Sequence, residues 1–515
     1  MTSSSPRGRP RHATAHISVR VAHALLGGAA GVVWLLLPGM TTVTEPPVAI
    51  TRPAPAASTA AAQPREDETS PTDLVLPVAA VGAAALLAGY VYVRRTRRSR
   101  PPATPAAVAR PTPPAASSGV LPPHPYTPAP GELDRQAQAA LVEADDCVRT
   151  SREELDFARE LYDAARLEPF TRALREAEGE LAAAFALRQR DDEGLPLEDE
   201  PARRHTLAGI VGRCAEAGRV LDATAAAFGE LRAVDTGRDD ALAVAEARFR
   251  ALAARAGQAE ATLTGLRETF AAGALDPVTG YAELAKDRLV TATTRLNEAR
   301  QAADRGESDR AAARLRSGEG AVAQAEVFVT AVDRLARELA AAREMLPAAL
   351  TGAEAELAAA RRSAPADVPP GELRSRIAHA DAVLASVRME LTGGRPYDPL
   401  AELRRIVRAL APVATGRAGV LMAAARLTAS SAVAAADGFV ATHRGVVGAG
   451  ARTRLATAAR ALGSDTPVGL VAAGTLAAAA RDHAEQDVRV HGPPPEPEPL
   501  AYGGPATRRR LESAD

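Results

Sequence analysis

Aromatic residues are scarce in this 515-residue chain, in which Phe, Trp and Tyr together make up 3%. Aromatic rings supply much of the buried area of a conventional globular enzyme core, so their scarcity argues against such a core. Alanine is abundant instead, together with Leu, Glu and Arg, and these residues favour helices. The composition therefore predicts long helices, and the length leaves room for roughly two to four domains.

Lysine is almost absent, because Lys286 is the only one and nearly all other basic residues are Arg. Lys286 stands in Ala-Lys-Asp, so the chain has no glycine-rich phosphate loop ending in Gly-Lys-Ser or Gly-Lys-Thr. The formal net charge is −1, which gives no overall basic field for nucleic acid. We therefore expect neither a nucleotide-binding loop nor a nucleic-acid partner.

Cysteine is limited to Cys147 and Cys214, which are far apart and form no Cys-x-x-Cys pair. Two cysteines cannot build a disulfide framework for a chain of this size, which suits a reducing compartment. We interpret both as small buried apolar residues.

The first apolar segment, Val21 to Leu37, follows a basic arm that contains Arg7, Arg9, Arg11 and Arg20. A basic arm before an apolar run is typical of a signal peptide, although no Ala-x-Ala cleavage site follows. A retained membrane helix is the alternative, at the short limit for spanning a bilayer. The sequence leaves both open.

The second apolar segment, Leu74 to Val93, has about the length that crosses a bilayer core. Five arginines follow it directly: Arg94, Arg95, Arg97, Arg98 and Arg100. Basic residues beside a membrane helix mark its cytosolic end, so these arginines predict that everything after residue 94 is cytosolic. Localisation at the cell membrane, with the lipid bilayer as a partner, follows.

Long stretches beyond the linker carry small or apolar residues at alternating steps of three and four, the repeat of a coiled-coil seam. The first such series runs from Ala137 through Leu141, Ala144, Val148, Ser151 and Leu155 to Ala158 and Tyr162. Similar series run from Leu207 to Phe228, from Leu242 through Phe249 to Phe270, from Ala285 through Ala292 and Leu296 to Ala303, from Leu315 through Gly318 to Leu339, and from Leu373 to Leu391. Short glycine-containing turns between series favour antiparallel neighbours.

The predicted fold class is all-α: a membrane helix or helical pair followed by an elongated antiparallel coiled-coil or helical bundle. The expected segments are a basic arm (1–20), a signal peptide or first membrane helix (21–40), a short extracytoplasmic Pro/Ala-rich segment (41–73), a transmembrane helix (74–93), a basic and then Pro-rich linker (94–130), a coiled-coil helical domain (131–350), an Ala-rich helical region (351–490) and a disordered tail (491–515).

Several blocks of the helical region resemble the cytosolic tail of actinobacterial membrane proteins that carry an extracytoplasmic TPM domain. They are Ala144-Asp145-Asp146 running to Phe157-Ala158, Ala184 to Gln189, Pro277-Val278-Thr279-Gly280, Ala285-Lys286-Asp287-Arg288-Leu289 and Phe328 to Leu339. The resemblance covers roughly residues 131 to 350. It implies the same topology and helical tail.

The chain departs from that family between its two apolar segments. The family has a TPM domain of more than about a hundred residues there, whereas only about 35 residues, mostly Pro, Ala and Thr, stand here. The TPM domain is therefore expected to be absent, and no phosphatase-like or metal-binding role carries over, because no residue corresponds.

No constellation in the sequence predicts chemistry. The four histidines of the helical region, His205, His379, His443 and His483, form neither His-x-x-x-His nor Glu-x-x-His pairs, so no metal or catalytic site is predicted. The acidic residues from Asp191 to Glu200 fit no calcium loop and read as a solvated loop, partly neutralised by Arg203 and Arg204. Lys286 is a motif residue of unknown role, expected at an exposed helix position. No converging polar residues are predicted on the core faces.

These observations favour a non-catalytic, membrane-anchored cytosolic scaffold that binds a protein partner or self-associates through its helices, with no cofactor. The alternatives are an accessory subunit or enzyme with a site inside the helical bundle, and a degenerate TPM-family relative.

Overall fold

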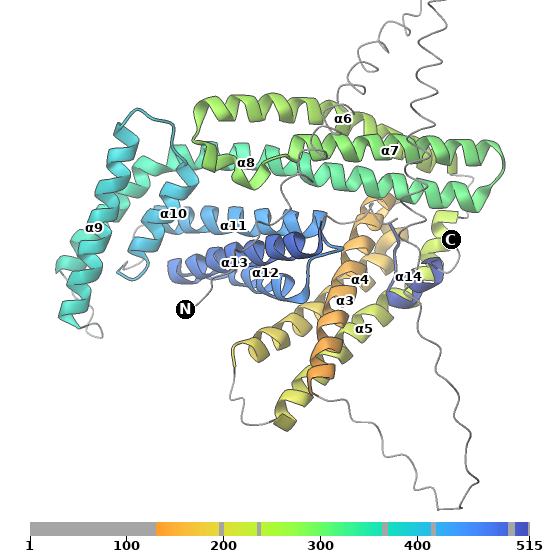
Figure 1. The fold of residues 1–515 in the computed structure, drawn as a ribbon, viewed down its shortest axis with the longest axis horizontal. Helices are drawn as coiled ribbons and strands as arrows, with labels where there is room; N and C mark the ends of the chain where they lie inside the picture. The colour runs from red at the N-terminus through yellow and green to blue at the C-terminus, as the bar shows by residue number, and fades with distance from the viewer. Residues whose placement is uncertain are drawn as a thin grey trace, which may run out of the picture. The chain divides into compact units, whose positions relative to one another are not determined.

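The computed structural model describes residues 130–194, 200–233, 238–362, 369–413, 419–492 and 500–512. They all belong to the second of the two compact units of the chain, Val120–Asp515. This part is all-helical and contains no strand (Figure 1). Its elements are α3 (Pro130–Ala158), α4 (Ala164–Asp192), α5 (Glu200–Ala233), α6 (Arg238–Thr269), the 3-10 helix η3 (Ala272–Val278), α7 (Tyr281–Asp304), α8 (Ser308–Arg362), α9 (Pro370–Thr392), α10 (Pro399–Leu410), α11 (Gly419–Thr442), α12 (Ala449–Ala461), α13 (Pro467–His491) and α14 (Pro505–Glu512).

Helices α3, α4 and α5 pack on one another around an apolar cluster. The predicted series of α3 is the face that enters this cluster, since Leu141, Val148 and Leu155 are fully buried. Asp163 begins α4 by accepting a hydrogen bond from the Arg166 backbone N–H at 2.9 Å, which satisfies one of the free donors of the first turn. The periodicity thus predicted the buried face of α3 correctly.

The longest helix, α8, packs against α6 and α7 on one side and α10 and α11 on another. Its 55 residues correspond to about 80 Å at 1.5 Å per residue. Pro347 lies inside it, where proline removes a backbone donor. The helix continues because Leu346, Ala349 and Ala353, on both sides of the proline, are fully buried. The boundary expected at residue 350 falls inside this helix.

Helices α11, α12 and α13 pack together around a second cluster, and α11 also contacts α8. Proline opens both α10 and α13, and the preceding residues, Asp398 and Thr466, cap them through their side chains. By length and composition, α11 is apolar enough to cross a membrane. In this fold it lies between protein helices, with Ala424, Ala436 and Val440 buried against them.

The end of the chain is ordered where a disordered tail was predicted. Tyr502 is 4% exposed, and α14 packs against α3 and α5. The prediction rested on the Pro- and Glu-rich composition before residue 500, but Leu500 and Tyr502 supply apolar surface that the bundle buries. Within the tail expected from residue 491, residues 500–512 therefore pack on the helical bundle. The basic arm, both predicted membrane segments, the linker up to residue 129 and the five topology-determining arginines lie outside the described residues.

Candidate functional site

A buried arginine, Arg452 of α12, joins the C-terminal helices to α3. Its side chain is 1% exposed, and its Nη1 donates to Asp145 at 2.6 Å and to Asp146 at 2.7 Å. The other guanidinium nitrogens donate to the backbone carbonyls of Val447 at 3.0 Å and Arg444 at 2.6 Å. All three guanidinium nitrogens therefore have acceptors, which a buried charge requires.

Two further arginines complete this network. Arg149 donates to Asp145 and to Asp437 of α11, both at 3.0 Å, and Arg444 reaches both carboxylate oxygens of Glu153 at 3.0 Å. Burial favours the neutral form of Asp145, but Arg149 and Arg452 together outweigh it and hold its pKa below the usual value. For Asp146, burial outweighs the attraction of Arg452, and its pKa is raised.

A second buried group links α3, α5 and α8 through Arg232. The Arg232 Nη2 donates to Glu319 of α8 at 2.6 Å, and its Nε lies 3.7 Å from Glu154 of α3. Burial raises the pKa of Glu319 to about 7, although the Arg232 guanidinium acts in the opposite direction. The nearby Glu154 carboxylate adds to the rise. Two buried carboxylates thus share one buried arginine.

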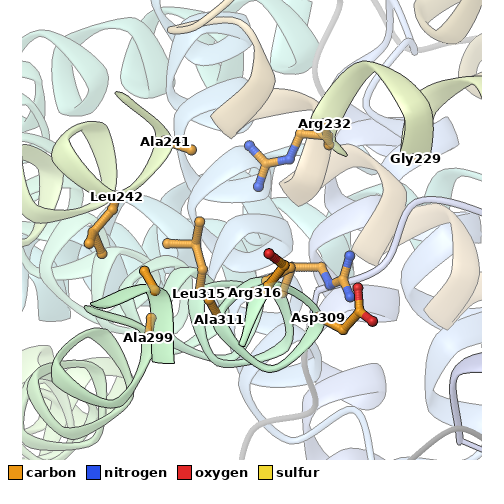
Figure 2. A pocket seen from close by; sticks show the side chains of 12 residues that line it. Gly229, Arg232, Ala241, Leu242, Ala299, Asp309, Ala311, Leu315 and Arg316 are labelled. Atoms are coloured by element: carbon orange, nitrogen blue, oxygen red, sulfur yellow. The ribbon is translucent and has the colours of Figure 1, made fainter. Parts of the chain in front are cut away.

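A cavity of about 100 Å³ opens beside this second group. Figure 2 shows Arg232 entering it from α5, with the side chains of Ala241, Leu242 and Leu315 across from it. Asp309 and Arg316 of α8 add polar groups to its rim. Among the described residues, Arg232 Nη1 and Glu154 Oε2 are buried atoms without a hydrogen-bond partner. The space has room for about three water molecules, or for a very small ligand.

Lys286 lies away from this cavity. Its Nζ is 2.8 Å from Glu260 Oε2 of the neighbouring helix α6, and the two side chains are 49% and 53% exposed. An ion pair this exposed contributes little to stability. Lys286 thus lies at an exposed helix position, paired with Glu260.

The predicted acidic loop is partly neutralised by arginine. Asp191 is buried between Arg203, at 3.3 Å, and Arg188, at 3.7 Å, and Arg204 pairs with Glu200 at 3.3 Å. Within the described ranges no group of three His, Cys, Asp or Glu side chains has the arrangement of a metal site. The Arg203–Asp191 ion pair joins α5 to α4.

Both cysteine thiols are expected to be unreactive toward thiol reagents in the folded chain. Cys147 is 0% exposed and Cys214 is 3% exposed, and burial raises the pKa of each thiol to about 12. Because the thiolate is the reactive form, an aromatic disulfide reagent at pH 8 should titrate no thiol in buffer and two per chain in denaturant. One rapidly titrating thiol in the native chain would contradict the packing described for α3 and α5.

The expectation that no polar residues converge on core faces is wrong for both groups. The sequence contained a signal for the Arg232 group. The series in α5 ends at Phe228, and one further step of four places Arg232 on the same face of the helix. Glu154 and Glu319 each lie next to a series position, which becomes buried when a third helix packs there. Arg452 gave no such signal, because its partners are 306 and 307 residues away.

Comparison with known proteins identifies relatives of the chain without an assigned activity. The chain is 30% identical over 381 residues to the UPF0603 proteins MT2410 and Rv2345, both from Mycobacterium tuberculosis, strains CDC 1551 and H37Rv. The alignment covers 69% of this chain and 58% of each relative, so the chain spans less than two thirds of their length. No family model matches, and no solved structure is similar. The similarity supports a relationship with an uncharacterised actinobacterial family.

Proposed function

We propose that the chain is a membrane-anchored, non-catalytic scaffold whose helical part lies in the cytosol as an antiparallel, coiled-coil-like bundle. The observation that carries the proposal is how the bundle uses its buried charges. Arg452 and Arg232 each bind carboxylates of helices far away in the sequence. Buried ionisable groups committed to one another fix how helices pack. A rigid helical body of this kind presents a constant surface to a partner or to another copy.

The anchor rests on the sequence. Leu74 to Val93 has the length of a membrane span, and the five arginines from Arg94 to Arg100 predict a cytosolic C-terminal side. The resemblance to membrane proteins with a TPM domain supports the same orientation. A tether, a linker and a long helical body, in that order, suit a protein that holds a partner at a set distance from the membrane.

Orientation can be tested with two cysteine variants, because the native thiols are buried. We expect a membrane-impermeant maleimide to label Ser58→Cys in intact cells, and to label Ser99→Cys only after permeabilisation. Crosslinking of the native membrane fraction, followed by co-purification, should then recover a specific protein partner or a second copy of the chain. Labelling of Ser99→Cys in intact cells would reject the orientation, and recovery of the chain alone would reject the scaffold role.

A site inside the bundle is the second candidate function, favoured by one observation. The cavity beside Arg232 combines apolar walls with a buried guanidinium, and this guanidinium donates to Glu319, a carboxyl outside the lining whose pKa is raised to about 7. A carboxyl poised near neutrality is suited to proton transfer. Native mass spectrometry that detects a small molecule bound to the chain, and lost in Arg232→Met, would favour this role over the scaffold.

A further inference from the structure

Residues 502–512 occupy a groove on α3, α4 and α5 in the manner of a bound peptide, whereas the Leu500 N–H donates to the Arg316 carbonyl of α8 at 3.4 Å. Tyr502 is the anchor: its ring stacks on Phe228, with centroids 4.4 Å apart, and meets Phe170 edge-on at 5.8 Å. Its hydroxyl donates to the Phe170 backbone carbonyl at 3.1 Å and lies 3.1 Å from Thr224 Oγ1. A buried ring with a satisfied hydroxyl is typical of an interface anchor.

The two glycines that follow Tyr502 fit where no side chain would. A Cβ on Gly504 would lie 2.1 Å from the Gly218 carbonyl oxygen of α5, which is a backbone atom and cannot move aside. Gly503 has φ +143°, a conformation that side chains rarely adopt, and its N–H donates to Ser151 Oγ at 3.1 Å. The groove therefore excludes a side chain at position 504 by shape, and the positive φ and the nearby Thr507 favour glycine at position 503.

The groove also supplies the N-terminal cap of α14. Asp222 of α5 accepts from the backbone N–H of Gly504 at 3.0 Å, of Thr507 at 2.9 Å and of Ala506 at 3.2 Å. It accepts the Thr507 hydroxyl as well, at 2.6 Å. Helices usually obtain this cap from their own sequence. Here the free donors of the first turn are satisfied by the receiving helix, so docking and helix formation are coupled.

We propose that this groove is a peptide-binding site for a Tyr-Gly-Gly-Pro segment that opens a helix, and that a second copy of the chain can supply this segment in place of the chain's own. The specific contacts of residues 502–507 lie on α3, α4 and α5, none of which adjoins them in the sequence. The contacts are therefore the same whichever copy provides the segment. The choice of a second copy as partner rests on the proposed scaffold function. The groove would give that scaffold a route to self-association.

The full chain with a protease site inserted between Gly492 and Leu500 tests the proposal. After cleavage, we expect the C-terminal fragment to stay bound through gel filtration, and an excess of fluorescent peptide 500–512 to displace it with saturable binding. The Tyr502→Ala peptide and the Gly504→Ala peptide should each bind at least about tenfold more weakly. Asp222→Asn in the protein should weaken the wild-type peptide as well. The uncut chain, whose groove is filled, should bind least.

Three outcomes would overturn the proposal: a Tyr502→Ala peptide that binds as well as wild type, a fragment that excess peptide never displaces, or loss of the helical circular dichroism signal on cleavage. A second measurement uses the uncut Tyr502→Ala chain. Arg508 of α14 lies beside the Cys147 thiol, which is 0% exposed, so release of the segment should uncover Cys147 and make it reactive while the helical signal persists. Unfolding of the whole bundle in the Tyr502→Ala chain would instead show that residues 500–512 are part of the core and not a displaceable segment. None of these readouts depends on membrane insertion, so they can fail independently of the scaffold proposal.

Discussion

Replacing Arg452 with methionine is expected to lower the free energy of unfolding by about 3–5 kcal/mol. Methionine fills much of the same volume but donates no hydrogen bond. Asp146 then loses the Arg452 guanidinium, which donates to it at 2.7 Å, and Asp145 keeps Arg149 alone as a charged donor. The carbonyls of Val447 and Arg444 lose their donors too. An unpaired buried carboxylate costs far more than a surface ion pair contributes. Urea denaturation followed by circular dichroism measures the loss.

Arg454→Ala is the matched control, because Arg454 belongs to the same helix and donates only to its own Gly450 carbonyl at the surface. Its effect should stay within about 0.5 kcal/mol. Adding Asp146→Asn to Arg452→Met should recover part of the loss, since it removes one of the stranded charges. Equal stability of Arg452→Met and wild type would show that α3 and α12 are not joined as described.

Much of the fold could be predicted from the sequence, because the spacing of apolar residues along a helix also determines which residues are buried. Residues at steps of three and four share one face of a helix, and that face can only be hidden by another helix. In α7, for example, Ala285, Ala292 and Leu296 were placed on the seam and are 0–4% exposed. Phe249 marks the limit of the rule, because this seam position is only partly buried at the edge of two clusters.

Buried charges could not be predicted in the same way, because their cost is offset by partners that only the tertiary fold supplies. Asp145 looks like an exposed helix residue until Arg452 reaches it from α12. The docking of Tyr502 was missed for a similar reason: one aromatic residue after a proline-rich stretch has no periodicity to detect. Its partners, Phe170 and Phe228, come from helices that end more than 250 residues earlier.

The stability of the chain should fall as pH rises from about 4.5 to 7, and Glu319→Gln should remove that part of the pH dependence. The pKa of Glu319 is raised from 4.5 to about 7 in the fold, chiefly by burial. Between these two values the folded chain keeps a proton that the unfolded chain has released, so raising the pH favours unfolding. Each pH unit in this window contributes about 1.4 kcal/mol at most, and the full effect approaches about 3 kcal/mol.

Glutamine keeps an oxygen that can accept the Arg232 hydrogen bond at this position but cannot ionise, which isolates the titration from the loss of the contact. The free energy of unfolding of wild type should therefore be lower at pH 8 than at pH 5. For the Glu319→Gln variant the two values should be similar. Glu344→Gln, on the exposed face of the same helix, is the control and should follow wild type. If Glu319→Gln shows the same pH dependence of stability as wild type, the Glu319 carboxyl is ionised throughout this pH range. Arg232, Glu154 and Glu319 then form an ordinary network of ion pairs. Such a result would also remove the observation that favours proton transfer at the cavity, because no group there would then titrate near neutrality.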